Sequence, residues 1–162
     1  MKQLLLVRHA KSDWNDDSLS DFDRPLNERG KRDAPAMAHR LLDKKVEIDG
    51  FISSPAKRAK KTAATFAKEY KRDKEDLILV DELYLAAEET FFKVISEASD
   101  KLDTIAVFSH NPGITDFANL LTDARIDNIP TCGIFAITID SKRWADFRHA
   151  KKEFWFFDFP KA

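Results

Sequence analysis

The chain has 162 residues, of which 43% are hydrophobic and 34% are charged, and this composition is typical of a globular protein with its own core. Its 27 lysines and arginines nearly balance its 28 aspartates and glutamates, which argues against an overall charge that attracts nucleic acid or an anionic membrane. Any anion site must therefore be local, and we expect one domain over residues 1–162.

The predicted elements alternate from the first residues onward. The continuous apolar run Lys2–Val7 predicts a central strand that is covered on both faces. The polar stretch Arg8–Pro25 predicts a long loop, and long loops in compact domains tend to be functional. A helix is predicted within Leu26–Lys45, with Asn27 as its cap. Pro35 interrupts such a helix unless it lies in the first turn, which favours a start later than Asn27.

The second half of the chain continues this alternation. The stretch EIDGFISS, residues 47–54, predicts a short strand, and Pro55–Asp73 predicts a helix with Ser53 or Ser54 as cap and Pro55 at its first position. Further strands are predicted at Leu77–Val80, Asp103–Ser109, Gly133–Ile139 and Glu153–Phe159, and further helices at Glu88–Ser99 and Gly113–Thr122. The pattern predicts an α/β three-layer sandwich, a mostly parallel central sheet with helices on both faces.

The single cysteine, Cys132, rules out an intramolecular disulfide and fits a reducing compartment. It lies in the apolar stretch IPTCGIFAITI, so we interpret it as a small buried residue rather than a nucleophile. The apolar start of the chain ends at Arg8 and His9, too early for a signal-peptide core. No run approaches the roughly 18 apolar residues of a membrane span. We therefore expect a cytoplasmic protein.

Three predicted strands end near residues that can bind or attack an anion. Arg8 and His9 follow the first strand, Arg58 follows the second, and His110 follows the strand that ends in VFS. Ligands of such sheets bind beyond the carboxyl ends of the strands, so we expect these side chains to converge. Two arginines match the oxygens of a phosphoryl group, and the helix start at Pro55 also favours an anion. A neutral histidine can attack phosphorus, so the set suits phosphoryl transfer without a metal.

Each of these residues has a simpler interpretation when it is taken alone. The dipeptide RH is common, His110 suits a core histidine bonded to backbone, and Arg58 lies in AKRAKK, which is typical of a solvated helix face. His39 and His149 lie on an amphipathic helix and in a polar stretch, and we interpret both as structural. The shared position just past a strand is what favours a site.

Four motifs in this chain resemble, in the same order, those of the histidine phosphatase superfamily, which has the phosphoglycerate-mutase-like fold. They are LVRHAKSDWN, RPLNERG, SSPAKRAKKTA and SHNPGI, and they extend over about Leu4 to Ile114, most of the chain. The chain length and the RHAKS and RPL forms are most similar to the short phosphohistidine phosphatase branch. The resemblance implies a phosphatase that needs no cofactor.

The resemblance also implies roles for particular residues. His9 is the nucleophile that becomes phosphorylated, and Arg8 and Arg58 bind the phosphoryl oxygens. His110 completes the pocket as a further donor. Three more positions match the family's pattern: Ser12 and Asn15 for phosphate contacts, and Arg24 at the pocket rim. We expect Trp14 to pack the loop rather than to touch the substrate.

Two positions depart from the family's pattern. The glycine that usually follows RH is Ala10, which narrows the backbone choices beside the nucleophile. The glutamate that many relatives use to protonate the leaving oxygen has no counterpart, because Leu85 stands in its place. Glu82, Glu88 or an aspartate within Asp13–Asp23 are open substitutes. General acid catalysis contributes ~10²–10⁴-fold, so an enzyme without it should favour labile P–N or aryl phosphates.

The leading hypothesis is a metal-independent phosphatase that acts through a phosphohistidine on His9. Its substrate would be phosphohistidine on a protein or a small phosphorylated metabolite. A mutase of the same fold is a weaker alternative, because the chain is short for the insertions that enclose a sugar-acid bisphosphate. A silent phospho-ligand binding module is disfavoured, because both arginines and both histidines are present. We expect a monomer, with neither nucleic acid nor a membrane as partner.

Overall fold

The computed structural model describes residues 1–161, and within them six strands form one mixed sheet. The strands are β1 (Lys2–Arg8), β2 (Gly50–Ser53), β3 (Ile78–Leu79), β4 (Thr104–Ser109), β5 (Ile134–Ile139) and β6 (Lys152–Asp158). Their order across the sheet is β3-β2-β4-β1-β5-β6. The neighbours from β3 to β1 pair in parallel, whereas β5 runs antiparallel to both β1 and β6. The predicted mostly parallel sheet is confirmed.

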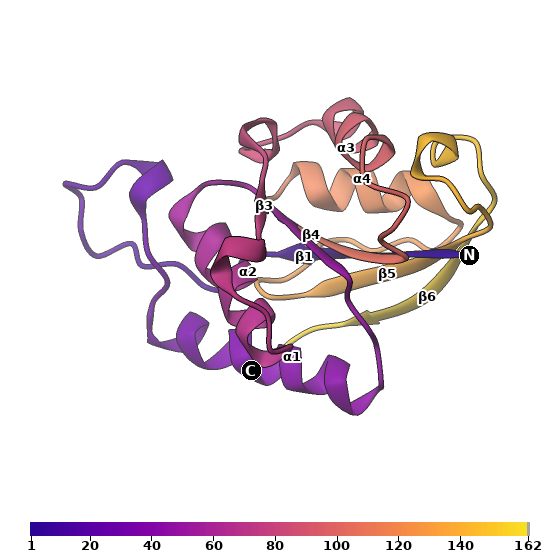
Figure 1. The fold of residues 1–162 in the computed structure, drawn as a ribbon. Helices are drawn as coiled ribbons and strands as arrows, with labels where there is room; N and C mark the ends of the chain where they lie inside the picture. Colours follow the sequence, from indigo (N-terminus) through magenta and orange to yellow (C-terminus); the bar gives the residue numbers. More distant parts are fainter. Residues whose placement is uncertain (162) are drawn as a thin grey trace.

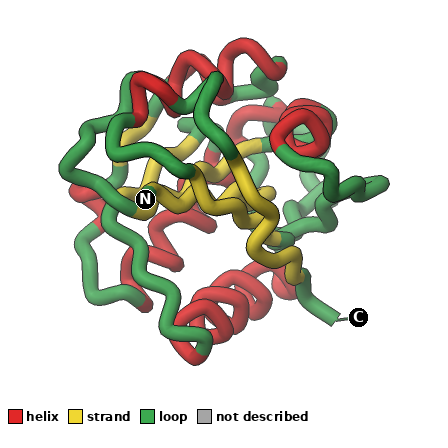
Figure 2. The backbone as a smooth tube through the Cα atoms, turned by 90° about the vertical axis from the view of Figure 1, so that its right-hand side faces the viewer, coloured by secondary structure: helices red, strands yellow, loops and turns green. Residues whose placement is uncertain are grey.

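Four helices cover the two faces of this sheet. They are α1 (Glu28–Asp43), α2 (Lys57–Glu69), α3 (Glu88–Ser96) and α4 (Gly113–Leu121). The first two lie on one face and the last two on the other, as the ribbon and the view turned by 90° show (Figures 1 and 2). Short 3₁₀ turns add η1 (Asp21–Asp23), η2 (Lys74–Asp76), η3 (Asp81–Leu83) and η4 (Trp144–Asp146). Among the described residues, no helix is long and apolar enough to cross a membrane.

The central strand β1 is buried on both faces because successive side chains of a strand point to opposite sides. Leu4 and Leu6 join the core under α3 and α4, and Leu5 and Val7 join the core under α1 and α2. All four are fully buried. This two-sided burial explains why the strand is apolar without alternation, and it fixes the position of the residues that follow it.

Asn27 caps α1 as predicted, but Pro35 does not delay the start of the helix. The helix begins at Glu28, and the Asn27 side chain accepts a 2.9 Å hydrogen bond from the Gly30 amide. Pro35 lies inside the helix, so the favoured later start is wrong. On the inner face of the helix, Ala34, Met37 and Ala38 are buried against the sheet, and this packing offsets the hydrogen bond that proline cannot make.

The start of α2 also differs from the prediction. The residue before the helix is Ala56, which makes no side-chain cap, so the prediction that Ser53 or Ser54 caps the helix is wrong. The Ser54 hydroxyl instead accepts from the Ala56 amide at 3.2 Å and lies 2.8 Å from His110 Nε2. The hydroxyl that would cap the helix is thus used to hold a histidine.

Candidate active site

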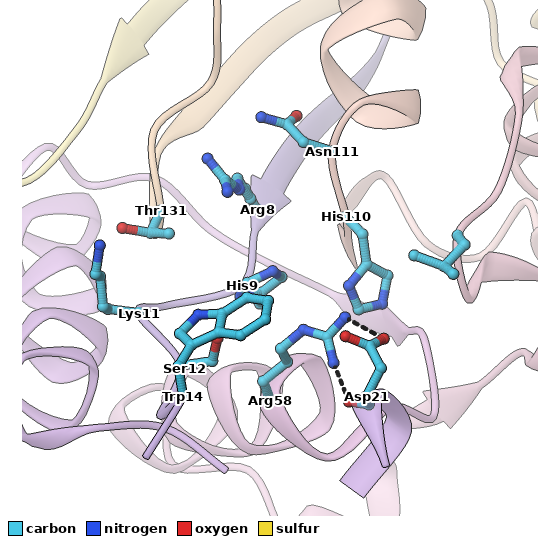
Figure 3. Close-up of a pocket in the computed structure, with 11 residues that line it drawn as sticks. Arg8, His9, Lys11, Ser12, Trp14, Asp21, Arg58, His110, Asn111 and Thr131 are labelled. Carbon is cyan, nitrogen blue, oxygen red and sulfur yellow. Dashed lines mark hydrogen bonds and ion pairs between the residues drawn. The ribbon is translucent and has the colours of Figure 1, made fainter. Parts of the chain in front are cut away.

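A cavity of about 270 Å³ lies where β1 and β4 end and α2 begins. Arg8 is the last residue of β1 and His9 follows it, His110 follows β4, and Arg58 lies in the first turn of α2. All four side chains line the cavity (Figure 3). The ring centroids of the two histidines are 5.2 Å apart. The structure therefore brings together the four residues that the strand ends singled out.

The ring of His9 is held in one orientation by backbone. Its Nδ1 lies 2.8 Å from the Ala10 carbonyl oxygen. A carbonyl can only accept, so Nδ1 carries the proton and Nε2 keeps its lone pair. The residue is only 7% exposed, and its amide donates to the Ser109 carbonyl at 3.2 Å. A neutral imidazole with a free Nε2 has the form that nucleophilic attack requires.

Both histidines are neutral at physiological pH. Burial lowers the pKa of His9 to about 4; the Ala10 carbonyl opposes this shift, and the nearby Arg58 and Arg8 cations reinforce it. Burial also lowers the pKa of His110 to about 3, with His9 and Arg58 as further causes. The surroundings thus keep the imidazole of His9 nucleophilic over a wide pH range.

We expect an NMR titration to find the midpoint of His9 near 4, well below the ~6.5 of a free histidine. A histidine is protonated below its pKa, so the nucleophilic form is lost only as pH falls through about 4. The unfolded chain binds the proton first, at ~6.5, so the contribution of His9 to stability falls as pH drops from there towards about 4. The measurement follows ring ¹⁵N shifts, assigned with a His9→Gln variant. A midpoint near 6.5 would contradict the expectation.

The backbone beside His9 is tied to α2 through Thr62. The Ala10 amide donates to Thr62 Oγ1 at 3.0 Å, and this hydroxyl donates in turn to the Arg58 carbonyl at 2.8 Å. Thr62 is completely buried. One hydroxyl therefore links the residue after His9 to the backbone of Arg58.

We expect Thr62→Val to destabilise the fold by about 1–3 kcal/mol, because the buried Ala10 amide loses its acceptor. The same change should lower phosphatase activity, since it loosens the backbone of His9. Urea denaturation and a steady-state assay measure the two effects. Thr65→Val is the matched control, since the Thr65 hydroxyl bonds only within α2, to the Lys61 carbonyl. Equal stability of the two variants would contradict the role given to Thr62.

Cys132 supports the same backbone from the other side. Its amide donates to the carbonyls of Arg8 and His9 at 3.1 and 3.0 Å. The thiol is fully buried, and burial raises the pKa of Cys132 far above its usual range, so it is not a thiolate. The prediction of a small buried residue is confirmed. Its positive φ of 59° is the backbone turn that brings the amide to both carbonyls.

Two arginines, Arg58 buried and Arg8 partly buried, make the cavity cationic. Arg8 donates through Nη1 to the Ile129 carbonyl at 3.0 Å, and its buried Nε has no partner among the described residues. Burial lowers the pKa of Arg8, and the neighbouring Arg58 cation lowers it further. Arg58 itself is 5% exposed. Two like charges held close together out of water favour the binding of an anion between them.

Asp21, on the turn η1, supplies an anion from the chain itself. Arg58 donates through Nη1 to the Asp21 backbone carbonyl at 2.6 Å and through Nη2 to its carboxylate at 3.0 Å. Arg24 and the Tyr84 hydroxyl donate to the same carboxylate. Burial alone would raise the pKa of Asp21, but the bonds from Tyr84, Arg24 and Arg58 outweigh it and lower the pKa far below its usual range. The carboxylate is therefore ionised.

Of the other three predicted site residues, Ser12 lines the cavity, whereas Asn15 and Arg24 do not. Ser12 is buried and lines it. Asn15 is exposed on the loop and is not a lining residue, so the structure does not bring it to the cavity. Arg24 is not a lining residue either, but it holds Asp21. Trp14, expected to pack the loop, stacks 3.3 Å from the Arg24 guanidinium and also lines the cavity, with 68% of its surface exposed.

Several residues that line the cavity, and the contact between Asp21 and Arg58, were not predicted from the sequence. The sequence offers Asp21 only as one of several possible acids and does not indicate its pairing with Arg58. The spacing of Asp21 and Arg24, three residues apart, was the available signal for an ion pair at the rim. No signal in the sequence pointed to Tyr84. The other lining residues that were not expected as contacts are Lys11, Asn111 and Thr131.

The structure limits which carboxylates could serve as the general acid. Leu85 lines the cavity and is 58% exposed. Neither Glu82 nor Glu88 lines it, and Glu82 pairs with Lys93 at 2.7 Å. Asp21 is the one carboxylate among the lining residues, and it is already bound by cations. In residues 1–161, no three His, Cys, Asp or Glu side chains are grouped so as to hold a metal ion.

Comparison with known proteins gives the same family that the motifs resemble. The model of the histidine phosphatase superfamily (branch 1) matches residues 4–85, half of the chain. An uncharacterized protein of Mycobacterium tuberculosis is 31% identical over 150 residues, which cover 86% of this chain and 90% of that protein. Phosphoserine phosphatase 1 of Hydrogenobacter thermophilus is 40% identical over 83 residues, 49% of this chain and 38% of that one.

The fold is shared with solved structures along its whole length. The putative phosphohistidine phosphatase SixA from Agrobacterium tumefaciens superposes with a TM-score of 0.83 and 25% identity, over 99% of both chains. A match of this extent in both directions leaves no large insertion in either chain. The predicted likeness to the short branch is confirmed.

Proposed function

The chain belongs to the histidine phosphatase superfamily and is a phosphatase, and we propose that it works without a metal through a phosphoenzyme formed on His9. The observation that carries the proposal is the state of the imidazole. Its Nδ1 proton is fixed on the Ala10 carbonyl, and its free Nε2 lies in a cavity lined by two arginines, of which Arg58 is buried and Arg8 is partly buried.

The proposed reaction has two displacements at phosphorus. In the first, the Nε2 lone pair of His9 forms a bond to phosphorus while the bond from phosphorus to the leaving atom of the substrate breaks. In the second, a water oxygen bonds to phosphorus, the P–N bond to His9 breaks, and inorganic phosphate leaves. Arg8 and Arg58 offset the negative charge of the phosphoryl oxygens in both steps, as positioned cations do in phosphoryl transfer.

The roles of the other lining residues follow from what they can donate. His110 is neutral, so its ring offers one N–H to a phosphoryl oxygen, and its Nδ1 has no partner among the described residues. The Ser12 hydroxyl, buried at the cavity wall, is a second neutral donor. We assign both to binding of the phosphoryl group. The predicted phosphate contact of Asn15 has no supporting observation, because this residue is exposed and does not line the cavity.

The leaving group sets the substrate class that we propose. Leu85 lies in the cavity where many relatives use an acid, and Asp21 is ionised and bound by arginines. An alkoxide leaves poorly without a proton, whereas the imidazole of phosphohistidine leaves well. The missing acid would otherwise contribute ~10²–10⁴-fold. We therefore propose phosphohistidine on a protein as the substrate, and note that the Agrobacterium protein of the same fold is named for that substrate class.

We expect a phosphohistidine peptide and an aryl phosphate to be hydrolysed at least about 10²-fold faster, in kcat/KM, than phosphoserine or another alkyl phosphate. The assay measures release of inorganic phosphate from each substrate under identical conditions. Leu85→Glu serves as the complementary variant, because a carboxyl at this exposed position should narrow the gap. Comparable rates for alkyl and N–P substrates would contradict the proposed substrate class.

The phosphoenzyme is tested directly by mass spectrometry. The protein is mixed with substrate, quenched in alkali, which preserves phosphohistidine, and digested. We expect the acid-labile phosphate on the peptide that contains His9 and on no other. Label that passes back into an organic product would indicate a mutase, and phosphate on another residue would overturn the assignment of the nucleophile.

A further inference from the structure

Asp21 occupies, through its backbone carbonyl and its carboxylate together, the two terminal nitrogens of Arg58 that an oxyanion would use. Both terminal nitrogens of Arg58 donate to Asp21, one to its backbone carbonyl at 2.6 Å and one to its carboxylate at 3.0 Å. Figure 3 shows the Asp21 carboxylate between Arg58 and His110, at the edge of the cavity. The buried cation is thus already paired with an anion of the chain itself.

A bound phosphoryl group and the Asp21 carboxylate are like charges that would share one guanidinium. A phosphoryl group carries a charge of about −2 near neutral pH, and a carboxylate carries −1. Two anions held close together in a partly buried site repel each other. The stronger anion therefore draws Arg58 away from Asp21, and the ion pair weakens when the phosphoryl group binds.

The surroundings of Asp21 allow this exchange. The carboxylate is carried by η1, a turn of three residues in a loop, and its side chain is 43% exposed. Arg24 binds the other carboxylate oxygen and is itself stacked on Trp14. A carboxylate that leaves Arg58 thus keeps a cationic partner and reaches water, so its release does not leave a buried unpaired charge.

We propose that Asp21 is a built-in competitor of the phosphoryl group: it pairs with Arg58, gives way when substrate binds, and returns as phosphate leaves. The inference rests on the proposed function, since it needs a phosphoryl group in this cavity. It assigns Asp21 a role in specificity, because an anion of charge −1 displaces a carboxylate less well than a dianion. It also assigns Asp21 a role in turnover, because its return helps to expel the product.

The test is a titration with inorganic phosphate and with orthovanadate, followed by calorimetry or by ³¹P and ⁵¹V NMR. Asp21→Asn removes the charge and keeps the size of the side chain. We expect it to bind phosphate about fivefold more tightly than the unchanged protein, the effect of losing one partly exposed ion pair. Product inhibition by phosphate should strengthen by the same factor.

Asp23→Asn is the matched control. Asp23 lies on the same turn, is exposed, and bonds only to Ser20 rather than to an arginine. It loses the same charge, so any general effect of the loop charge appears in both variants. We expect its phosphate affinity to stay within about twofold of the unchanged protein, because its charge lies outside the cavity.

Tyr84→Phe provides a second route to the same answer if Asp21→Asn does not fold. The phenol donates to the Asp21 carboxylate, while its ring packs edge-on against Phe22, so phenylalanine keeps the packing and removes the donor. Weakening the hold on Asp21 should again tighten phosphate binding, by a smaller factor.

The outcomes separate this inference from the proposed function. Tighter phosphate binding by Asp21→Asn than by Asp23→Asn supports competition. If the unchanged protein binds phosphate and Asp21→Asn binds it equally or more weakly, competition is overturned, and Asp21 instead orients Arg58. If neither the unchanged protein nor any variant binds phosphate or vanadate, the proposed function fails, and the competition fails with it.

Discussion

Replacing His9 by alanine is expected to abolish turnover and the phosphoenzyme together. His110 does not replace it as nucleophile, because His110 Nε2 is engaged with the Ser54 hydroxyl and its Nδ1 is the N–H donor proposed above for the phosphoryl group. Loss of a covalent nucleophile typically costs several orders of magnitude, so we expect kcat to fall by at least about 10³-fold. A discontinuous assay with an aryl phosphate and intact-mass measurement after substrate addition follow the two quantities.

The matched control for this variant is His39→Ala. His39 is exposed on α1 and does not line the cavity. Its Nε2 lies 2.7 Å from the Glu69 carboxylate. Its removal should leave kcat within about twofold. Turnover by His9→Ala within tenfold of the unchanged protein would refute the nucleophile. No turnover by the unchanged protein, with tight binding of phosphate, would instead favour the silent binding module.

Arg58→Lys is expected to lower kcat/KM by about 10²–10³-fold, although it keeps the positive charge. A lysine offers one compact ammonium, whereas the guanidinium presents a planar set of donors. Two of those donors hold Asp21, and the same donors are the ones that would turn to the phosphoryl oxygens. The measurement is kcat/KM with an aryl phosphate, together with the affinity for vanadate.

Arg40→Lys controls for the loss of an arginine as such. Arg40 pairs with Asp158 at 2.6 Å, an arginine–carboxylate contact outside the cavity, so activity should not change. The double variant of Asp21→Asn with Arg58→Lys adds a further constraint. If Asp21 acts through Arg58, the gain in phosphate affinity from Asp21→Asn should disappear. A loss of less than tenfold for Arg58→Lys would remove Arg58 from the binding of the phosphoryl group.

The sequence was most informative where a side chain is fixed by its distance from a strand. Arg8, His9 and His110 each lie within one residue of a strand end, and strands of one parallel sheet end at the same edge. Their convergence therefore follows from the alternation of strands and helices. Arg58 could be predicted for a similar reason, since it lies in the first turn of the helix that follows β2.

The parts that could not be predicted depend on tertiary contacts of the loops. The pairing of Asp21 with Arg58 joins residues 37 positions apart through a loop without periodicity. Tyr84 reaches the same carboxylate over 63 positions. Local patterns carry no information on such distances. Pro35 shows that a local pattern can also mislead. Proline usually interrupts a helix, but here the burial of α1 against the sheet outweighs this effect.

The hydrogen bonds from the Cys132 amide make the geometry at His9 depend on a late part of the chain. The amide that holds the carbonyls of Arg8 and His9 belongs to the segment just before β5, which pairs with β1. Among the described strands, the first along the chain is thus completed by one of the last. A chain that stops short of β5 carries every reacting group and still lacks the frame that aims them, so premature termination should give inert fragments rather than unregulated enzymes.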